Sequence, residues 1–106
     1  MANKGETLLQ NAIRAELSQV GIVRRNNVGT FLTQYGVPVA IGLPGESDLT
    51  LFLHGGQTIF VEVKTPNGRQ SARQRHFQEV IESYGFRYVI LRSLEDARKV
   101  IEEVTA

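Results

Sequence analysis

The feature that most constrains this chain is a pair of apolar runs, residues 49–53 and 58–64, joined by a short turn that contains two glycines. Two β-prone runs separated by such a turn predict a β-hairpin. The first run directly follows Asp48, and the second ends in Glu62 and Lys64 with one residue between them. Because side chains alternate between the two faces of a strand, Glu62 and Lys64 share a face. We therefore expect two carboxylates and an ammonium to meet at one edge of a sheet, which suits a divalent cation and a phosphodiester.

Three helices are expected around this hairpin. Apolar residues recur at helical spacing over residues 6–20. Ser71 and Gln74 form a capping-box pattern that opens a second helix, and Ser93 is placed to cap a third. Each of these segments carries an apolar face, so each is expected to pack against the sheet.

Further strands are expected over residues 22–28 and 86–91. Residues 29–37 are ambiguous between a loop and a short strand, and residues 39–41 can add a few strand residues. The expected order is αβ(β)ββαβα, an α/β fold with a mixed sheet flanked by helices. The helix between the hairpin and residue 86 permits a right-handed crossover and hence a parallel pair. The length suits one domain, expected to span residues 1–106.

Composition excludes several classes of protein. The chain has no cysteine, which rules out disulfide frameworks and thiolate zinc sites. No apolar run approaches the ~18 residues that span a bilayer, so no membrane partner and a cytoplasmic location are expected. The formal net charge is only +1, and any contact with nucleic acid must therefore come from a local basic patch.

The acidic candidates need separate arguments, because each also has a structural interpretation. Glu46 and Asp48 both precede the hairpin, and Asp48 is favoured since Glu46 sits in a glycine-containing loop that faces solvent. Glu6 lies on the inward stripe of the first helix, where capping shared with Asn3 and metal binding are equally good explanations. Gln74 shares a face with inward residues, so it can act in capping, in catalysis or in both.

Basic residues gather near these acids. Arg69, Arg73 and Arg75 follow the hairpin, and Arg24 and Arg25 form a second group. Such groups often make solvated surfaces, but next to clustered acids they are candidates for phosphate contacts. The neighbouring residue Asn26 is open between a turn former, a sheet-edge residue and a contact to a nucleic-acid groove.

Five features, in order along the chain, match a known family: Glu6 with Gln10, Arg25-Asn26-Asn27, the loop over residues 42–48, Glu62-Val63-Lys64, and Ser71 with Gln74. Together they resemble the virus-type replication-repair nuclease (VRR-NUC) domain, a branch of the PD-(D/E)XK restriction-endonuclease-like superfamily. The resemblance covers nearly the whole chain. One departure is Ser47, which stands where a proline often precedes the first acid of the motif. That residue is not a ligand, so activity is still expected.

The resemblance implies a restriction-endonuclease-like core and Mg²⁺- or Mn²⁺-dependent cleavage of DNA. Carried over by residue, it implies three acidic metal ligands, a carbonyl ligand, a catalytic lysine and a nearby glutamine: Glu6, Asp48 and Glu62, the Val63 carbonyl, Lys64, and Gln74. The basic residues expected at DNA are Arg24, Arg25, Arg69 and Arg73, with Asn26 beside them.

Stand-alone domains of this size resemble phage or prophage proteins that act as homodimers on branched DNA such as four-way junctions. A four-way junction has two-fold symmetry, and a two-fold dimer supplies the paired cuts that resolve it. A flap or nicking endonuclease of the same fold is the alternative within the enzymes. A non-catalytic nucleic-acid-binding module is the alternative outside them.

Overall fold

A computed structural model describes residues 4–106 of the chain. It contains three helices and six strands, in an order that confirms the expected α/β class. Their bounds are α1 (Lys4–Leu17), β1 (Gly21–Arg25), β2 (Gly29–Leu32), β3 (Pro38–Ile41), β4 (Leu49–Leu53), β5 (Thr58–Val63), α2 (Ala72–Ser83), β6 (Arg87–Leu91) and α3 (Leu94–Thr105). Asn3, the candidate cap of the first helix, lies outside the described residues.

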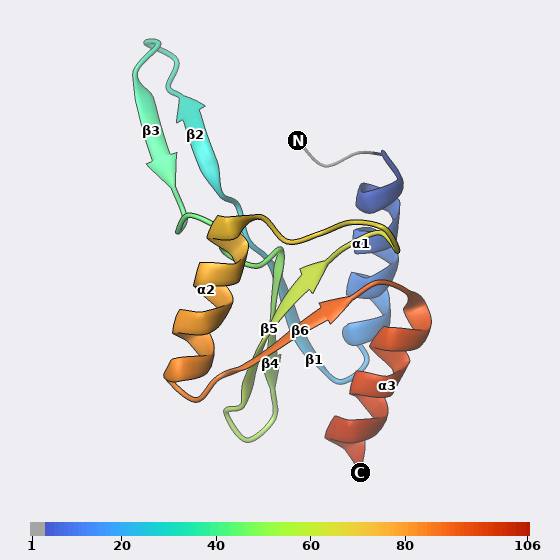
Figure 1. Cartoon of the computed structure of the whole chain (residues 1–106). Coiled ribbons are helices and arrows are strands. Elements are labelled where there is room, and N and C mark those ends of the chain that lie inside the picture. The colour runs from blue at the N-terminus through green and yellow to red at the C-terminus, as the bar shows by residue number, and fades with distance from the viewer. Residues whose placement is uncertain (1–3) are drawn as a thin grey trace.

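The main sheet has four strands in the order β1-β4-β5-β6. The expected hairpin is β4–β5, an antiparallel pair, and β1 joins β4 on its other side. β6 pairs with β5 in parallel after the crossover through α2, as the spacing predicts. Helices α1 and α3 pack together on one face of the sheet, and α2 covers the other (Figure 1).

The two faces of the central hairpin carry different side chains. One face packs with α1 and α3 into the main core, which contains Ile13, Leu17, Leu49, Leu51, Ile59, Val61, Val63, Leu91, Ala97 and Val100. On the other face, Phe60 makes edge-on ring contacts with Phe77 of α2 and with Phe86. Strand alternation places Glu62 on this second face, under α2, and Val63 in the main core. The apolar alternation therefore fixes which side of the sheet the acid occupies.

Several boundaries differ from the expectation. α1 ends at Leu17 rather than at residue 20, because residues 18–20 form a tighter turn with bonds such as Val20 N to Leu17 O at 3.1 Å. On α2, Phe77 is buried as expected and packs against the rings of Phe60 and Tyr88. Tyr84, the residue that follows α2, is 76% exposed, so the buried face is shorter than the sequence indicates.

The ambiguous stretch proves to be a separate antiparallel hairpin, formed by β2 and β3. It projects from the body of the molecule (Figure 1). With this hairpin included, the molecule measures 50 Å in its longest direction. Its turn is closed by Thr33, whose amide donates to the Val37 carbonyl at 2.9 Å and whose hydroxyl accepts from the Val37 amide. The structure therefore has one strand more than the expected order αβ(β)ββαβα. None of the helices within residues 4–106 is long and apolar enough to cross a bilayer.

The loop before β4 lies against the start of α2 at Gly45. Its φ of 74° is in the left-handed region, and a Cβ added there would lie 2.3 Å from the Arg73 carbonyl oxygen. Only glycine permits both the conformation and the close approach. This contact fixes the loop that precedes Asp48 next to the first turn of α2.

We therefore expect Gly45→Ala to destabilise the protein more than Gly55→Ala. Gly55 also has a positive φ, of 86°, but no atom lies within 4 Å of its added Cβ. Gly55→Ala should cost about 1 kcal/mol in backbone strain, and Gly45→Ala about 3 kcal/mol because the α2 backbone must also move. Urea unfolding of the two variants measures the difference. Equal losses would contradict the close contact.

Candidate active site

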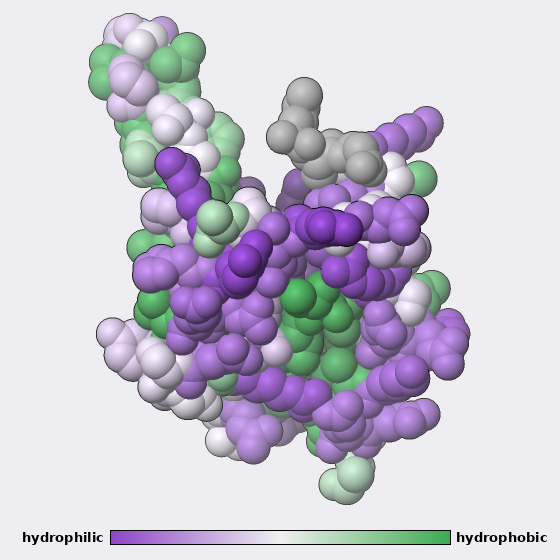
Figure 2. Space-filling view, in the orientation of Figure 1, coloured by the Kyte–Doolittle hydropathy of each residue, from purple (hydrophilic) through white to green (hydrophobic). Residues whose placement is uncertain are grey.

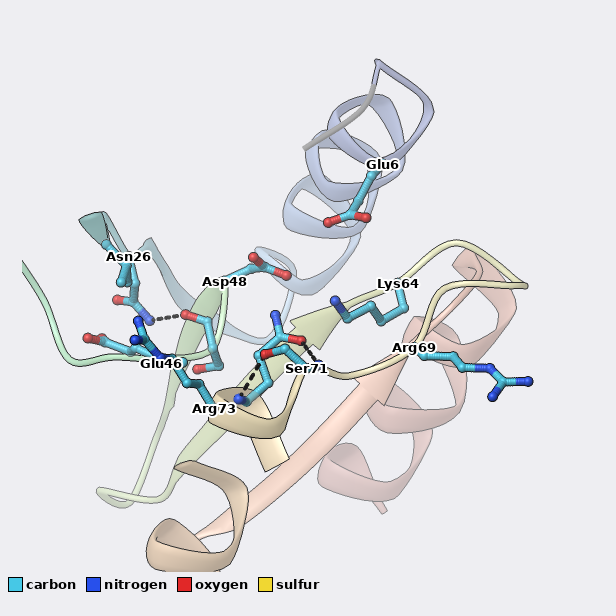
Figure 3. Close-up of a pocket in the computed structure, with 12 residues that line it drawn as sticks. Glu6, Asn26, Glu46, Asp48, Lys64, Arg69, Ser71 and Arg73 are labelled. Carbon is cyan, nitrogen blue, oxygen red and sulfur yellow. Dashed lines mark hydrogen bonds between the residues drawn. The ribbon is translucent and has the colours of Figure 1, made fainter. Parts of the chain in front are cut away.

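An open cleft of about 650 Å³ lies where α1, the start of β4, the end of β5 and the start of α2 meet. It brings together four of the residues singled out for metal binding or catalysis, namely Glu6, Asp48, Lys64 and Gln74. In Figure 3 the carboxylates of Glu6 and Asp48 and the ammonium of Lys64 point into one space from three different elements. The cleft is therefore the site where the chain gathers opposite charges from distant parts of its sequence.

Asp48 is held in place by backbone and side-chain bonds. Its Oδ2 accepts from the Val63 amide at 2.8 Å, which ties the start of β4 to the end of β5. Its carbonyl accepts from the Asn26 amide at 2.9 Å. The Asn26 side chain donates to the Ser47 carbonyl and to the Thr50 hydroxyl on either side of Asp48. Asn26 therefore fixes the backbone on both sides of Asp48. Of the three roles that the sequence leaves open for Asn26, this is the sheet-edge role.

Glu62 is fully buried behind the cleft, on the α2 face of β5. Its Oε2 accepts a hydrogen bond from the Tyr88 hydroxyl at 3.3 Å. Its Oε1 is a buried atom with no hydrogen-bond partner among the described residues. A buried carboxylate oxygen without a donor is costly unless it is protonated or meets a cation.

The environment of Glu62 changes its protonation. Burial first, and then hydrogen bonding and charge from the adjacent Asp48 carboxyl, raise the pKa of Glu62, while Lys64 and Tyr88 act in the opposite direction; the resulting pKa is about 9. Burial, followed by the charge of Glu62, also raises the pKa of Tyr88, which keeps its hydroxyl a donor. At neutral pH Glu62 therefore holds a proton.

Lys64 follows β5 and is 9% exposed, yet it forms no salt bridge with any residue in the 4–106 range. Its backbone amide donates to the Leu91 carbonyl at 3.1 Å. The loop after it is held by Arg92, whose guanidinium donates to the carbonyls of Thr65 and Gly68 at 2.8 and 2.7 Å. The backbone at Lys64 and just after it is thus fixed, and the ammonium points into the cleft (Figure 3).

Glu6 and Gln74 line the cleft from opposite sides. Gln74 does form the capping box: Ser71 Oγ accepts from its amide, and its Oε1 accepts from the Ser71 amide at 2.8 Å. Glu6 faces the cleft from α1, half-buried. Within residues 4–106, however, no three acidic or histidine side chains lie close enough to hold a metal ion. Asp48 and Glu62 interact directly with each other, and Glu6 faces the same cleft from α1.

The candidate DNA-binding residues divide into two groups. Arg69 and Arg73 line the cleft, and Arg69 points outward from it in Figure 3. Arg24 and Arg25 are exposed on β1, the outer strand of the main sheet, and do not line the cleft. Glu46 also lines the cleft, where its carboxylate accepts from the Leu43 amide at 3.1 Å and closes its own loop.

Three residues important to this geometry escaped the sequence analysis. Tyr88 holds Glu62, Gln70 donates weakly to Tyr88 at 3.4 Å, and Arg92 fixes the loop after Lys64. The parallel register pairs Phe60 with Tyr88, so Tyr88 shares a face with Glu62. A tyrosine next to the apolar run of residues 89–91 is the signal that could have found it, because a buried hydroxyl needs a partner.

The chain resembles known proteins in sequence and in fold. The family model of the VRR-NUC domain matches residues 39–95, which include Asp48, Glu62 and Lys64. A solved structure described as a VRR-NUC domain is 24% identical with a TM-score of 0.70, covering 94% of this chain and 97% of that one. The small subunit of the heterodimeric restriction endonuclease R.BspD6I is 20% identical with a TM-score of 0.42, covering 87% of this chain and 51% of its own. No curated protein matches the chain.

The raised pKa of Glu62 predicts how the metal-free protein responds to pH. The folded state binds the proton more tightly than an unfolded chain, whose glutamate has a pKa of 4.5. The resulting stabilisation is complete below pH 4.5 and is lost as the pH rises toward 9, by up to about 1.4 kcal/mol per pH unit. Glu62→Gln removes this dependence because glutamine does not ionise.

Thermal unfolding in EDTA between pH 5 and 9 measures the effect. The melting temperature of the wild type should fall more steeply than that of Glu62→Gln. Glu79→Gln, a change at an exposed position of α2, is the matched control and should keep the wild-type slope. Parallel curves for all three proteins would contradict a buried proton on Glu62.

Proposed function

The chain belongs to the VRR-NUC family, and from this we propose that it is a Mg²⁺- or Mn²⁺-dependent DNA endonuclease that cuts branched DNA, preferentially four-way junctions, as a homodimer. One observation carries the proposal. The fully buried Glu62 carboxyl and the half-buried Asp48 carboxyl lie beside the Lys64 ammonium at an open cleft. A buried acid next to a second acid is costly in a structural role and suits a site that takes up a cation.

The donor set fits a hard divalent cation. The orphaned Oε1 of Glu62 lacks the partner that a cation would supply. Mg²⁺ usually takes only one or two carboxylates from the protein and completes its shell with water and substrate phosphates. Asp48 and Glu62 with the Val63 carbonyl supply such a set, and Glu6, standing across the cleft, would act through water or substrate. When bound, the cation polarises the scissile phosphate and lowers the pKa of a coordinated water.

The remaining residues have roles toward DNA. Lys64 donates hydrogen bonds to the negative charge that develops on the phosphate, and orients the attacking water. Arg69 and Arg73, at the cleft, are the side chains best placed to grip neighbouring phosphates. Arg24 and Arg25 lie farther along the sheet, where only a longer duplex reaches them. Gln74 holds the start of α2 and faces the same cleft, so its capping and catalytic roles are compatible.

The preference for four-way junctions and the homodimer follow from symmetry rather than from the cleft. Resolving a junction requires two cuts related by a two-fold axis, and one cleft makes one cut. A dimer acting on cellular DNA also accords with the expected cytoplasmic location. Selectivity for a branch comes from surface shape and assembly, and the fold by itself does not specify it.

Replacing the central residues tests the chemistry. Glu62→Gln and Lys64→Ala should each lower the cleavage rate at least ~100-fold, since each removes a group that acts at the reacting phosphate. DNA affinity in Ca²⁺ or EDTA, measured by fluorescence anisotropy, should change by less than about threefold because Glu62 is buried and Arg69 and Arg73 remain. Lys99→Ala, an exposed lysine on α3, is the matched control. Wild-type cleavage by Lys64→Ala would refute the assignment.

The choice of substrate and cation is tested in one assay. Four-way junctions, flaps, nicked duplexes and linear duplexes are incubated with Mg²⁺, Mn²⁺ or EDTA. We expect paired cuts in junctions with either cation and none in EDTA. Cleavage confined to flaps or nicks would favour the related endonuclease activity. DNA binding without cleavage in any cation, unchanged by Asp48→Asn, would indicate a non-catalytic binding module instead.

A further inference from the structure

The β2–β3 hairpin, here called the arm (residues 29–41), differs from the rest of the molecule in charge. From residue 26 to residue 45 the chain has no Lys, Arg, Asp, Glu or His. With 22% charged residues overall, a stretch of this length would carry about four charges. The uncharged stretch begins immediately after Arg25 and ends immediately before Glu46, so it coincides with the arm and its two connections to the body.

The arm is also exposed and unsupported. Every residue of β2 and β3 is exposed, and the two strands share no substantial packing with any other helix or strand in the described part of the chain. In Figure 2 the arm, at the upper left, shows hydrophobic residues among weakly polar ones, whereas much of the body is strongly hydrophilic. The large apolar residues on the arm and its connections are 40–83% exposed: Val28, Phe31, Leu32, Tyr35, Val37, Val39, Ile41 and Leu43.

The strand register divides these residues between two faces. Phe31 lies opposite Val39, and Gly29 opposite Ile41, which gives one face a continuous apolar stripe. Leu32 lies opposite Pro38 on the other face. An isolated two-stranded hairpin is at best marginally stable in water. An apolar surface of this kind on a projecting hairpin marks an interaction site.

We propose that the arm is the homodimer interface, and that it packs against the arm of a second copy of this chain across a two-fold axis. The inference rests on the homodimer of the proposed function and assigns it a surface. Within residues 4–106, neither outer edge of the arm has a strand partner. A two-fold axis places a strand antiparallel to its own copy. An unpaired edge strand of the arm can therefore form β-sheet hydrogen bonds with the same strand of a second copy.

A second copy fits this surface better than DNA does. Proteins hold a DNA duplex mainly through positively charged side chains at its phosphates. The arm has no positively charged side chain. A standard protein interface takes ~20–30 residues from each partner, and the uncharged stretch supplies 20. The depletion of charge at the centre of an interface, with aromatic residues present, is the usual pattern between proteins.

The position of the arm links this interface to the cleft. Val28 and Gly45, at the two connections of the arm, both line the cleft. At the base, a Cβ added to Gly42 would lie 2.6 Å from the Asn27 carbonyl oxygen, so the two connections are closely packed. Pairing of two arms therefore fixes the separation and orientation of two clefts, as paired cuts require.

Charge introduced into the arm tests the proposal. The double variant Phe31→Lys/Leu32→Lys places one lysine on each face, at residues 47% and 72% exposed. The matched control is Ile22→Lys/Phe52→Lys, a neighbouring pair on the main sheet with 72% and 40% exposure. Sedimentation velocity over a concentration series should show a wild-type dimer and a control dimer. The arm variant should be monomeric, with a dissociation constant raised at least tenfold.

Single cysteines give an independent measurement, because the chain has none of its own. Among Phe31→Cys, Leu32→Cys and Val39→Cys, at least one should form a disulfide-linked dimer on mild oxidation, and Ile22→Cys should not. Far-UV circular dichroism and the melting temperature check folding. They should stay near wild type because the arm lies outside the main core.

The outcomes separate this inference from the proposed function. A dimer that persists in the arm variant places the interface elsewhere and overturns the inference, while the homodimer stands. A wild type that is monomeric but cuts DNA overturns both the inference and the dimer, and leaves the nuclease. Loss of DNA binding in a monomeric arm variant, with a monomeric wild type, would make the arm a DNA-contacting element instead. Absence of cleavage by a wild-type dimer would remove the nuclease and leave the interface.

Discussion

The burial of Glu62 beside Asp48 is the constraint on which the rest of the site depends. A buried acid beside a second acid is unfavourable, and the fold offsets this cost locally. Tyr88 donates to one oxygen of Glu62, and the Val63 amide donates to Asp48. The other oxygen of Glu62 has no donor among the described residues. The protein thus retains an incompletely satisfied carboxylate at the end of its most buried strand, which is the property of a site rather than of a core.

The sheet places these groups with little help from loops. β4 and β5 are antiparallel neighbours, so the residue before β4 and the last residue of β5 meet at one edge. β6 runs parallel to β5 and brings Tyr88 beneath Glu62. The glycine contact at residue 45 and the Arg92 bonds to the loop after Lys64 then fix the two segments that leave the sheet. Rigid elements therefore hold both acids and the lysine, as precise chemistry requires.

Much of this could be predicted from the sequence, because it depends on local periodicity. Strand alternation places Glu62 on the α2 face and Val63 in the main core, and the spacing of Ser71 and Gln74 gives the capping box. Tyr88 could not be predicted, since its role depends on the register between two strands that are far apart in the chain. The arm could not be predicted either, because uncharged alternating residues suit a buried strand as well as an exposed one. The exposure of Tyr84 shows the same limit, since periodicity gives a face but not what covers it.

The hydrogen bond between Tyr88 and Glu62 joins residues 26 positions apart. During synthesis, β5 is complete well before β6, and until β6 docks, one edge of β5 is open to water. In that interval Glu62 lacks the Tyr88 hydroxyl that donates to it. The environment of the two acids is therefore completed only with the last strand. A chain that ends before β6 has both acids but not the hydroxyl donor that holds one of them.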